Sequence, residues 1–329
     1  MSSIIQNPKT YTHHELENIF FRPMLSGKSA EELGIRVLYN MPMPTTVQLL
    51  DKPEDVLVAM EGATSWKGGK RSVLYQKTIP MTRVKAENAF AASDYFSTVF
   101  ELIASSSGVN MEDLTGTELE AAETELFRKA IAASIAMGLW LGDTSGSYKS
   151  GYTAFDGILK LITERSADDL NEKVTNLSTQ LEQKSVVELF DQIIEAASPR
   201  MRGLYGEGQT ALFVSSGIYH LYEKWLDENH SAAAYTDIQT GRQTLKYHGF
   251  PLVEVNLEPS ISSSTFSKEF IIFTDRRNIV LAVNTADTPG SEVRMWYNPD
   301  EMENRQRAVF SIGVELLDDA LTSVYIDEQ

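Results

Sequence analysis

The stretch Leu139-Trp140-Leu141-Gly142-Asp143-Thr144-Ser145-Gly146-Ser147, followed shortly by Tyr152-Thr153-Ala154-Phe155-Asp156-Gly157-Ile158, decides how the rest of the chain is interpreted. A long helical pattern runs into a glycine- and serine-rich loop at this point, and glycine is the residue type that most often closes a helix. The two segments have the character of a rigid building block. They do not have the character of a catalytic pocket.

The clearest predicted helix covers residues 117–141 and leads into this loop. Its first residues form a capping box, with Thr117 as the N-cap and Glu120 at the N3 position. Glutamates fill the first turns, and Arg128 and Lys129 come later, as the helix dipole favours. With a rise of about 1.5 Å per residue, the helix is about 40 Å long, which suits a structural strut. Apolar side chains recur at three- and four-residue spacing: Leu119, Ala122, Leu126, Ala130, Ala133, Met137 and Leu141.

The composition is that of a folded and strongly acidic protein. The chain has 329 residues, of which 42% are hydrophobic, enough for one elaborated domain or two modest ones. Its 29 Lys and Arg against 46 Asp and Glu give a net charge of −17, which argues against a protein that clamps nucleic acid through its net field. The same charge is compatible with a protein that lies beside nucleic acid without binding it tightly. A generic soluble acidic protein remains an equal interpretation of the charge alone.

Several classes of protein are excluded by what the sequence lacks. It has no cysteine, which excludes disulfides, thiolate metal sites and cysteine nucleophiles. The N-terminal residues lack a basic region followed by an apolar one, so they do not resemble a secretory signal. No apolar run approaches the roughly 20 residues that a membrane-spanning helix needs. We therefore expect synthesis and folding in a cytosol.

The first part of the chain has the pattern of an extended arm followed by a projecting hairpin. In residues 1–50 small apolar groups, including Phe20 and Phe21, alternate with polar turns, and Pro42 and Pro44 favour an extended path. An arm that packs on other parts of the fold or on a neighbouring subunit fits this pattern, and so does an ordinary N-terminal helix and loop.

Residues 55–88 predict a hairpin, with one strand at 56–60 and the other from 72 to 79, continuing towards Val84. Gly68 and Gly69 supply the backbone freedom for a turn. An isolated ribbon of this kind is marginally stable and needs a partner surface. The tip carries a tryptophan, glycines and basic residues: Trp66, Lys67, Gly68, Gly69, Lys70 and Arg71.

Helices and strands are mixed in the remainder, which predicts an α+β protein. A short helix is expected at 156–165, another at 185–197 that stops before Pro199, and one after Ser215 and Ser216. Strands are expected at 211–214, 252–255, 270–274, 279–283 and 308–314.

The short motifs that could indicate catalysis or ligand binding are weak. Residues 142–146 differ in spacing from the Gly-Asp-Ser-Gly of trypsin-like proteases, and residues 25–29 lack the first glycine of a phosphate-binding loop. The glycine-rich residues 203–208 have no strand–helix–strand context and are interpreted as a mobile connection. The histidines show no metal-ligand spacing and are interpreted as solvated or structural: His13, His14, His220, His230 and His248. We expect no catalytic, cofactor or metal site.

The order of these segments resembles the major capsid proteins of tailed bacteriophages (Caudoviricetes), which have the Hong Kong ninety-seven fold. The matching features are Gly142-Asp143 with Gly157-Ile158 after the long helix, 212–216 before an amphipathic helix, 249–253, 273–279 and 311–315. Each motif is short. Their collinear order, from about residue 50 to the end, carries the resemblance.

This resemblance implies an α+β capsid fold divided into several parts. Residues 1–50 would be an N-terminal arm and 51–92 an extended loop that overlaps a neighbouring subunit. Residues 93–205, including a spine helix at 117–141, and the returning 291–329 would form a peripheral domain, and 206–290 an axial domain. The inter-subunit contacts would include the hairpin tip, Trp66 to Arg71, together with Phe20 and Phe21.

The resemblance also implies a function and a set of partners. Copies of the chain would form pentamers and hexamers of an icosahedral virion capsid, assembled in the host cytoplasm around double-stranded DNA, without enzymatic activity, cofactor or membrane. The partners would be the chain itself, a separate scaffold, a portal and decoration proteins. The lysine cross-link of some members is not carried over, because Lys67 and Lys70 have no matching Asn and Glu.

Two other functions remain open. One is an encapsulin-type nanocompartment shell, which shares the fold and encloses a protein cargo. The other is a soluble cytosolic hydrolase that uses Asp143 or Ser145.

Overall fold

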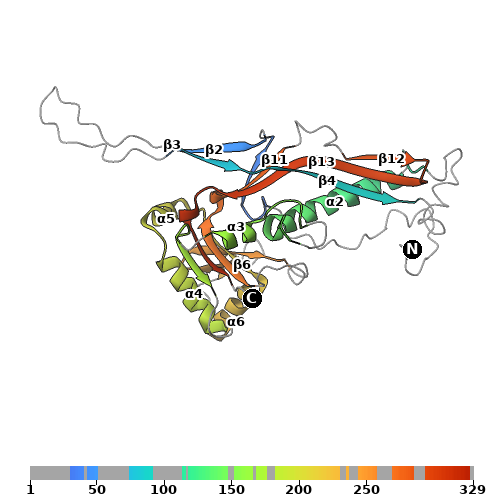
Figure 1. Cartoon of the computed structure of the whole chain (residues 1–329). Helices are drawn as coiled ribbons and strands as arrows, with labels where there is room; N and C mark the ends of the chain where they lie inside the picture. The colour runs from blue at the N-terminus through green and yellow to red at the C-terminus, as the bar shows by residue number, and fades with distance from the viewer. Residues whose placement is uncertain are drawn as a thin grey trace, which may run out of the picture.

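The computed structural model describes residues 30–40, 43–50, 74–91, 113–115, 118–146, 152–165, 168–175, 182–229, 235–236, 244–257, 269–284 and 293–326. Within these residues a five-stranded sheet, a seven-stranded sheet and a two-stranded ribbon are joined by helices (Figure 1). The α+β class predicted from the sequence is therefore confirmed.

One long strand organises the five-stranded sheet. Strand β13 (Glu303–Leu316) pairs along one side with β4 (Thr82–Phe90), and on its other side with β12 (Arg294–Asn298) and then β11 (Ile279–Asn284). Strand β1 (Arg36–Tyr39) extends the sheet by pairing parallel to β11. All the neighbours of β13 are antiparallel to it, so this sheet can carry one buried and one solvated face.

Helix α2 (Glu118–Leu141) lies along this sheet and ends inside the protein (Figure 1). It agrees within one residue with the helix predicted at 117–141; the expected cap Thr117 lies outside the described residues. The final residues of the helix, from Ala136 to Leu141, are all buried. The Trp140 ring lies 5.9 Å from the rings of both Phe213 and Phe270, which belong to the other sheet. The end of the strut is thus held between the two sheets.

The seven-stranded sheet is buried on both faces at its centre. Strands β6 (Thr210–Ser215) and β10 (Phe270–Asp275) are buried at every position, which explains their continuous apolar sequences. Leu212 and Ile271 face one core cluster, whereas Phe213 and Phe270 face the other. The strand order is β5 (Glu172–Thr175), β14 (Thr322–Ile326), β10, β6, β9 (Phe250–Val255), β8 (Thr244–Tyr247) and β7 (Tyr235–Thr236).

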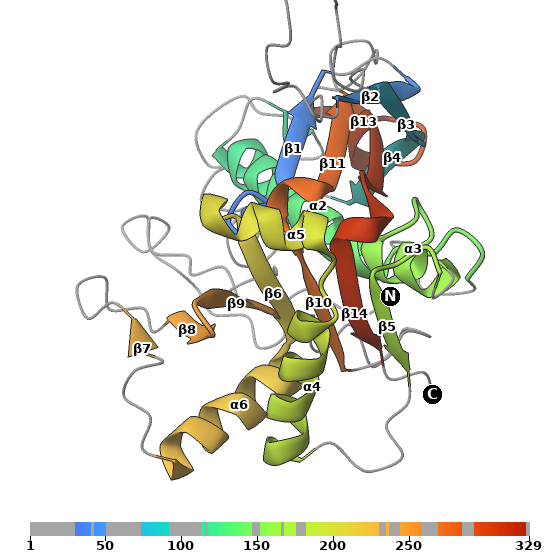
Figure 2. The ribbon, with the colours of Figure 1, turned by 90° about the vertical axis from the view of Figure 1, so that its left-hand side faces the viewer.

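Two amphipathic helices cover one face of this sheet (Figure 2). They are α4 (Gln183–Glu195) and α6 (Ser216–Glu228); the end of α2 and helix α3 (Ile158–Glu164) pack against the opposite face. Helix α4 begins before the predicted Ser185, because Glu182 is the N-cap and the Ser185 hydroxyl accepts a hydrogen bond from its backbone at 2.8 Å.

A helical segment replaces the mobile connection expected at 203–208. Helix α5 (Pro199–Leu204) starts with the Ser198 side chain accepting from the Met201 backbone N–H, and the 3₁₀ turn η3 (Tyr205–Glu207) continues it. Pro199 therefore begins a helix as well as following one, since proline is well suited to the first helical turn.

The ribbon differs from the predicted hairpin in its partner strand. Strand β3 (Leu74–Ile79) pairs with β2 (Thr45–Leu50), which lies in the stretch assigned to the arm; the expected strand at 56–60 lies outside the described residues. The strand also does not continue to Val84. The chain leaves the ribbon at Pro80, which cannot donate to a ladder, and β4 joins the five-stranded sheet. Gly313 in β13 makes this crossing possible, because an added Cβ would lie 2.2 Å from the Pro80 carbonyl oxygen.

Candidate functional site

The ribbon formed by β2 and β3 has a buried base and an exposed outer end. At the base, Ile79 is fully buried and packs with Val280 and Leu317 of the body. Farther out, Leu74 and Tyr75 remain 51% and 50% exposed. Because a two-stranded ribbon is only marginally stable in water, apolar side chains at its outer end favour contact with another surface.

The register of the ribbon turns one cation towards the body. Directly opposed residues of an antiparallel pair share a face, so Lys77 lies on the same side as its partner Val47, which packs with the base cluster. Lys77 is 3.3 Å from Asp319 and 3.8 Å from Glu315. The ribbon is therefore attached to the body by charge as well as by apolar packing.

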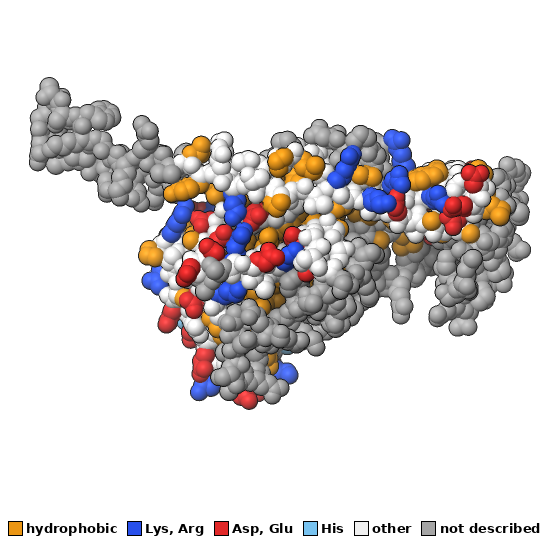
Figure 3. All heavy atoms as spheres, in the orientation of Figure 1, with side chains coloured by type: hydrophobic (Ala, Val, Ile, Leu, Met, Phe, Trp, Pro, Cys, Tyr) orange, Lys and Arg blue, Asp and Glu red, His pale blue; other side chains and the backbone are white. Residues whose placement is uncertain are grey.

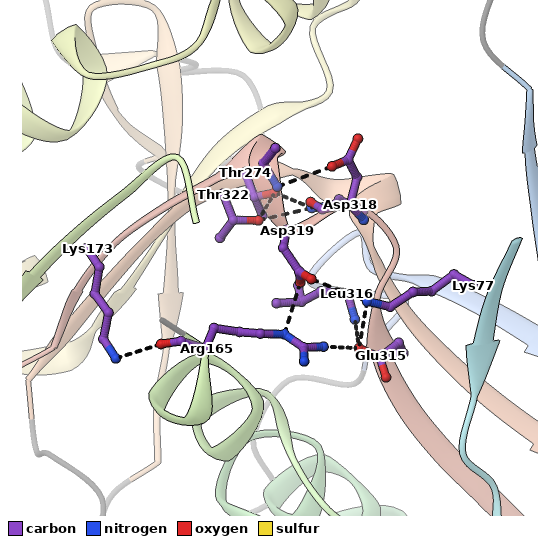
Figure 4. A network of polar contacts seen from close by, with 11 residues as sticks. Lys77, Arg165, Lys173, Thr274, Glu315, Leu316, Asp318, Asp319 and Thr322 are labelled. Atoms are coloured by element: carbon purple, nitrogen blue, oxygen red, sulfur yellow. Dashed lines mark hydrogen bonds and ion pairs between the residues drawn. The ribbon is translucent and has the colours of Figure 1, made fainter. Parts of the chain in front are cut away.

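These contacts belong to a cluster of two cations and two carboxylates, which we call the ribbon clasp: Lys77, Arg165, Glu315 and Asp319 (Figure 4). Arg165 is the C-cap residue of α3, and its guanidinium lies 2.9 Å from Glu315 and 3.3 Å from Asp319. The cations thus come from the ribbon and from the end of α3, and the carboxylates from the end of β13 and the following 3₁₀ turn η7 (Asp319–Leu321). The clasp joins three separate parts of the chain at one point.

A second set of hydrogen bonds fixes the turn that carries the carboxylates. The Asn278 side-chain amide donates to the hydroxyls of Thr274 and Thr322, each at 3.0 Å, and to the Asp318 carbonyl at 2.9 Å. Its carbonyl oxygen accepts from the Asp318 backbone N–H at 2.8 Å. Asp318 also pairs with Arg200 of α5 at 3.0 Å. The link from β13 to β14 is therefore held in one conformation (Figure 4).

Burial and the neighbouring cations have opposite effects on the pKa of Glu315, the buried carboxylate of the clasp. The Glu315 side chain is only 8% exposed, and this burial raises its pKa above the ordinary value, although Lys77 and Arg165 act in the opposite direction. Ionised Glu315 is therefore costly unless both cations stay in place. This links the charge state of one buried group to the position of the ribbon.

The glycine–aspartate motif that follows the long helix forms a tight junction between α2 and α3. A Cβ on Gly142 would lie 2.3 Å from the Phe155 carbonyl oxygen, and one on Gly157 would lie 2.6 Å from the Gly138 carbonyl oxygen. The backbones approach so closely that only glycine fits at these positions.

A buried lysine connects the same junction. The Lys160 ammonium, whose side chain is 9% exposed, lies 2.9 Å from Asp143 and 2.7 Å from Asp156. Burial acts to raise the pKa of Asp143, but hydrogen bonds from Ser145 and Lys160 outweigh it and hold that pKa below its usual value. The Ser145 hydroxyl donates to Asp143 at 2.6 Å. These contacts hold Asp143 and Ser145 in place at the junction between α2 and α3.

The structure does not describe the residues predicted to contact other subunits. Trp66, Lys67, Gly68, Gly69, Lys70, Arg71, Phe20 and Phe21 all lie outside the described residues. The clasp residues were not identified from the sequence, since positions 77, 165, 315 and 319 are far apart and show no local spacing. The only sequence signal is Lys77 within an otherwise uncharged strand, Leu74–Ile79.

Two kinds of feature are absent from the described part of the chain. No group of three or more histidine, aspartate or glutamate side chains in it is arranged to hold a metal ion. None of its helices is both long enough and apolar enough to cross a membrane.

Comparison with known proteins identifies the fold. No protein-family model matches the chain, and no curated protein matches its sequence. Solved structures do match. A chain of the satellite phage P4 procapsid, in a structure that includes the size determination (Sid) protein, is 11% identical with a TM-score of 0.56, and the match covers 91% of this chain and 95% of that chain.

Two other matches are of the same kind. The capsid of an empty GTA particle gives a TM-score of 0.55 at 15% identity, covering 94% of this chain and 100% of that chain. A chain from Gordonia phage Cozz gives 0.54 at 12% identity, covering 98% and 92%. The chain therefore has the fold of phage capsid proteins, and at these identities the likeness concerns the fold alone.

Proposed function

We propose that this chain, with its phage capsid fold, is the structural subunit of an icosahedral shell that assembles from copies of itself. The observation that carries the proposal is the extent of the match. The shared fold covers more than nine-tenths of this chain and of each of the three capsid and phage chains. In the full proposal the copies form pentamers and hexamers that enclose double-stranded DNA.

The described residues supply physical support for assembly. The outer end of the ribbon exposes Leu74 and Tyr75, while its base is clamped onto the body by the clasp residue Lys77. A held ribbon with an uncovered apolar end can bury that end on a second copy at little cost in conformational entropy. Many such contacts shared among neighbours would add to a stable shell.

We further propose a role in the shell for each segment of the chain. Residues 1–50 would be the arm, 51–92 the loop that overlaps a neighbour, 93–205 and 291–329 the peripheral domain, and 206–290 the axial domain. Sheet membership favours adjusting these limits: β2 begins the ribbon, β11 belongs with the five-stranded sheet, and α4 and β14 belong with the seven-stranded sheet. The contacts would include Phe20, Phe21 and the tip at 66–71.

The net charge of −17 supports a wall that does not immobilise packaged DNA. A separate scaffold, a portal and decoration proteins would be the other partners, and the virion would be the location. A non-enzymatic role is supported by the helix junction, where Asp143 is engaged by Lys160 and Ser145.

Electron microscopy of the purified chain, alone and co-expressed with its neighbouring genes, tests the proposal. We expect closed particles that contain nucleic acid in the co-expressed sample. Persistent monomers under all assembly conditions would contradict the proposal. Closed particles filled with a protein and free of nucleic acid would favour the nanocompartment shell.

The double variant Asp143→Asn with Ser145→Ala tests the hydrolase. We expect it to change stability or assembly only, and loss of a hydrolytic activity measured in the parent chain would favour the enzyme.

A further inference from the structure

Three strands run side by side at one end of the five-stranded sheet and leave an open face on the side away from α2. Where β4, β13 and β12 are paired, Asn304 and Gln306 of β13 are buried. The side chains of the alternating residues Arg305 and Arg307 are 33% and 51% exposed. Register places Trp296 and Ala89 on either side of Arg305, on the same face. This face is therefore solvated along three strands.

The open face is hollowed at its centre. A cavity of about 340 Å³, which we call the strand trough, is lined by Trp296 and its neighbours on three strands: Glu87, Asn88, Ala89, Trp296, Arg305, Gln306 and Arg307. The small Ala89 leaves room across from the tryptophan, whose side chain remains 39% exposed. A tryptophan beside a hollow with basic walls is the kind of surface that anchors a protein partner.

Two cations at the wall of the trough share a single carboxylate. Glu87 is the carboxylate shared by two cations, because it accepts hydrogen bonds from Lys85 at 2.7 Å and from Arg307 at 2.6 Å. On a chain with a net charge of −17 this is a local excess of positive charge. Figure 3 shows basic side chains gathered along this end of the sheet, with acidic side chains beyond them at its tip. An acidic partner segment would complement the trough.

The turn between β12 and β13, which we call the tip (residues 299–302), is acidic and exposes an apolar side chain, so it complements the trough. Met302 is 59% exposed and has a positive φ of 53°, an unusual conformation for a residue with a side chain. It is flanked by Asp300, Glu301 and Glu303. Arg305 contacts both Glu301 and Glu303 of its own chain, so the tip is held in a defined shape.

From these observations we propose that the tip of one copy of this chain sits in the strand trough of a second copy. Met302 packs against Trp296, a favourable contact between a thioether and an aromatic ring. Asp300 of the tip pairs with Lys85 and Arg307 of the second copy, which share one carboxylate in the free chain. Glu301 and Glu303 stay with Arg305 of their own chain. This inference rests on the proposed self-assembling function and names one surface that assembly uses.

The geometry of this contact has a consequence for symmetry. Tip and trough are different patches on one chain, so the contact is heterologous, and successive copies close into a ring or continue as an open chain. The tip joins β12 and β13, which form two walls of the trough, and β4 forms the third. A closed ring would therefore place its rotation axis next to this hairpin.

Disulfide trapping between two differently tagged variants tests the proposal. The chain has no cysteine, so Met302→Cys in one copy and Ala89→Cys in the other introduce the only thiols. Each variant carries one thiol, so every disulfide joins two copies. After co-assembly and oxidation we expect a covalent heterodimer at about tenfold or more over the yield from dilute, unassembled chains, because assembly raises the effective concentration.

Two controls sharpen the test. Met302→Cys mixed with Lys184→Cys, whose side chain is 86% exposed on α4, should give only the background yield. Adding Arg307→Glu to the Ala89→Cys variant should lower the heterodimer yield, because the tip would then meet like charge.

The outcomes distinguish failure of the tip-in-trough contact from failure of the proposed function. Particles that assemble without the heterodimer overturn the tip-in-trough contact and leave the proposed function standing. A covalent dimer from Met302→Cys alone at a higher yield than the heterodimer also overturns it, because the tips would then meet each other in place of the trough. If the unmodified chain never assembles, the proposed function fails and this contact fails with it.

Discussion

The seven-stranded sheet and the ribbon differ in how far their apolar strands are buried. Every position of β6 and β10 is buried, and the two faces of the sheet pack on different helices. In β3 the outer residues Leu74 and Tyr75 are half exposed, and only Ile79 at the base is fully buried. The seven-stranded sheet buries its apolar side chains within a single chain, whereas the ribbon leaves apolar surface that a partner can cover. Stability of the chain and stability of an assembly can therefore be altered separately.

The largest effect on folding is expected from a cavity in the sheet. Phe213→Ala removes a fully buried ring that contacts Trp140, and it should lower the free energy of unfolding by about 3–5 kcal/mol. Urea denaturation of the unassembled chain measures this difference. A loss below about 1 kcal/mol would mean that the seven-stranded sheet tolerates a cavity far better than close packing implies.

The next largest effect is expected where α2 meets α3. Gly142→Ala places a methyl group against the Phe155 carbonyl oxygen, and we expect a loss of about 1–3 kcal/mol, or insoluble protein. Gly203→Ala in helix α5 is the matched control, since no atom outside its chain neighbours and its own helix backbone lies within 4 Å of an added Cβ. This control should be neutral or stabilising by up to about 1 kcal/mol. Equal losses in the two variants would argue against the close backbone approach.

A smaller, pH-dependent effect is expected at the clasp. Burial raises the pKa of folded Glu315 above its unfolded value, so the stability from this group is present below the unfolded pKa and is lost as pH rises through the folded pKa. Relative to Glu315→Gln, the parent chain should therefore lose stability as pH rises from the ordinary glutamate value through the raised one. Chemical denaturation of both proteins across this pH range measures the difference.

Asp143→Asn provides a control with the opposite sign. Hydrogen bonds lower the pKa of folded Asp143, so its contribution is present above the unfolded pKa and is lost as pH falls through the folded one. Parallel pH dependences for the two variants would contradict the assigned causes.

The smallest effect on folding is expected at the ribbon. Leu74→Ser with Tyr75→Ser changes only side chains that are about half exposed, and the free energy of unfolding of the unassembled chain should change by about 0.5 kcal/mol or less per residue. Particle yield by electron microscopy should fall sharply in the same variant. Normal particles would show that the outer ribbon is not used in assembly, and a large loss of chain stability would show that it packs on its own body.

Elements with strong local patterns were predictable from the sequence. The long helix agrees within one residue with the prediction from apolar spacing and charge. Buried strands such as β6 and β10 were found from continuous apolar runs. The limits of α4 were less accurate, because Glu182 acts as an N-cap although it is not a typical capping residue.

Pairing between distant segments was not predictable. The partner of β3 is β2, and the choice depends on where Pro80 ends the ribbon and Gly313 lets the chain cross. The clasp combines residues from β3, α3, β13 and η7, and no short spacing relates them. The strand trough likewise exists only because β4 and β12 lie on either side of β13.

By itself the sequence determined the acidic charge, the absence of cysteine chemistry, the long helix and the glycine junction at its end. These follow from composition and from contacts between residues close in the chain. The tertiary structure alone decided which strands pair, which apolar side chains remain uncovered and which buried carboxylate holds the ribbon. Those features depend on packing between segments that are distant in the sequence, and local sequence carries little record of it.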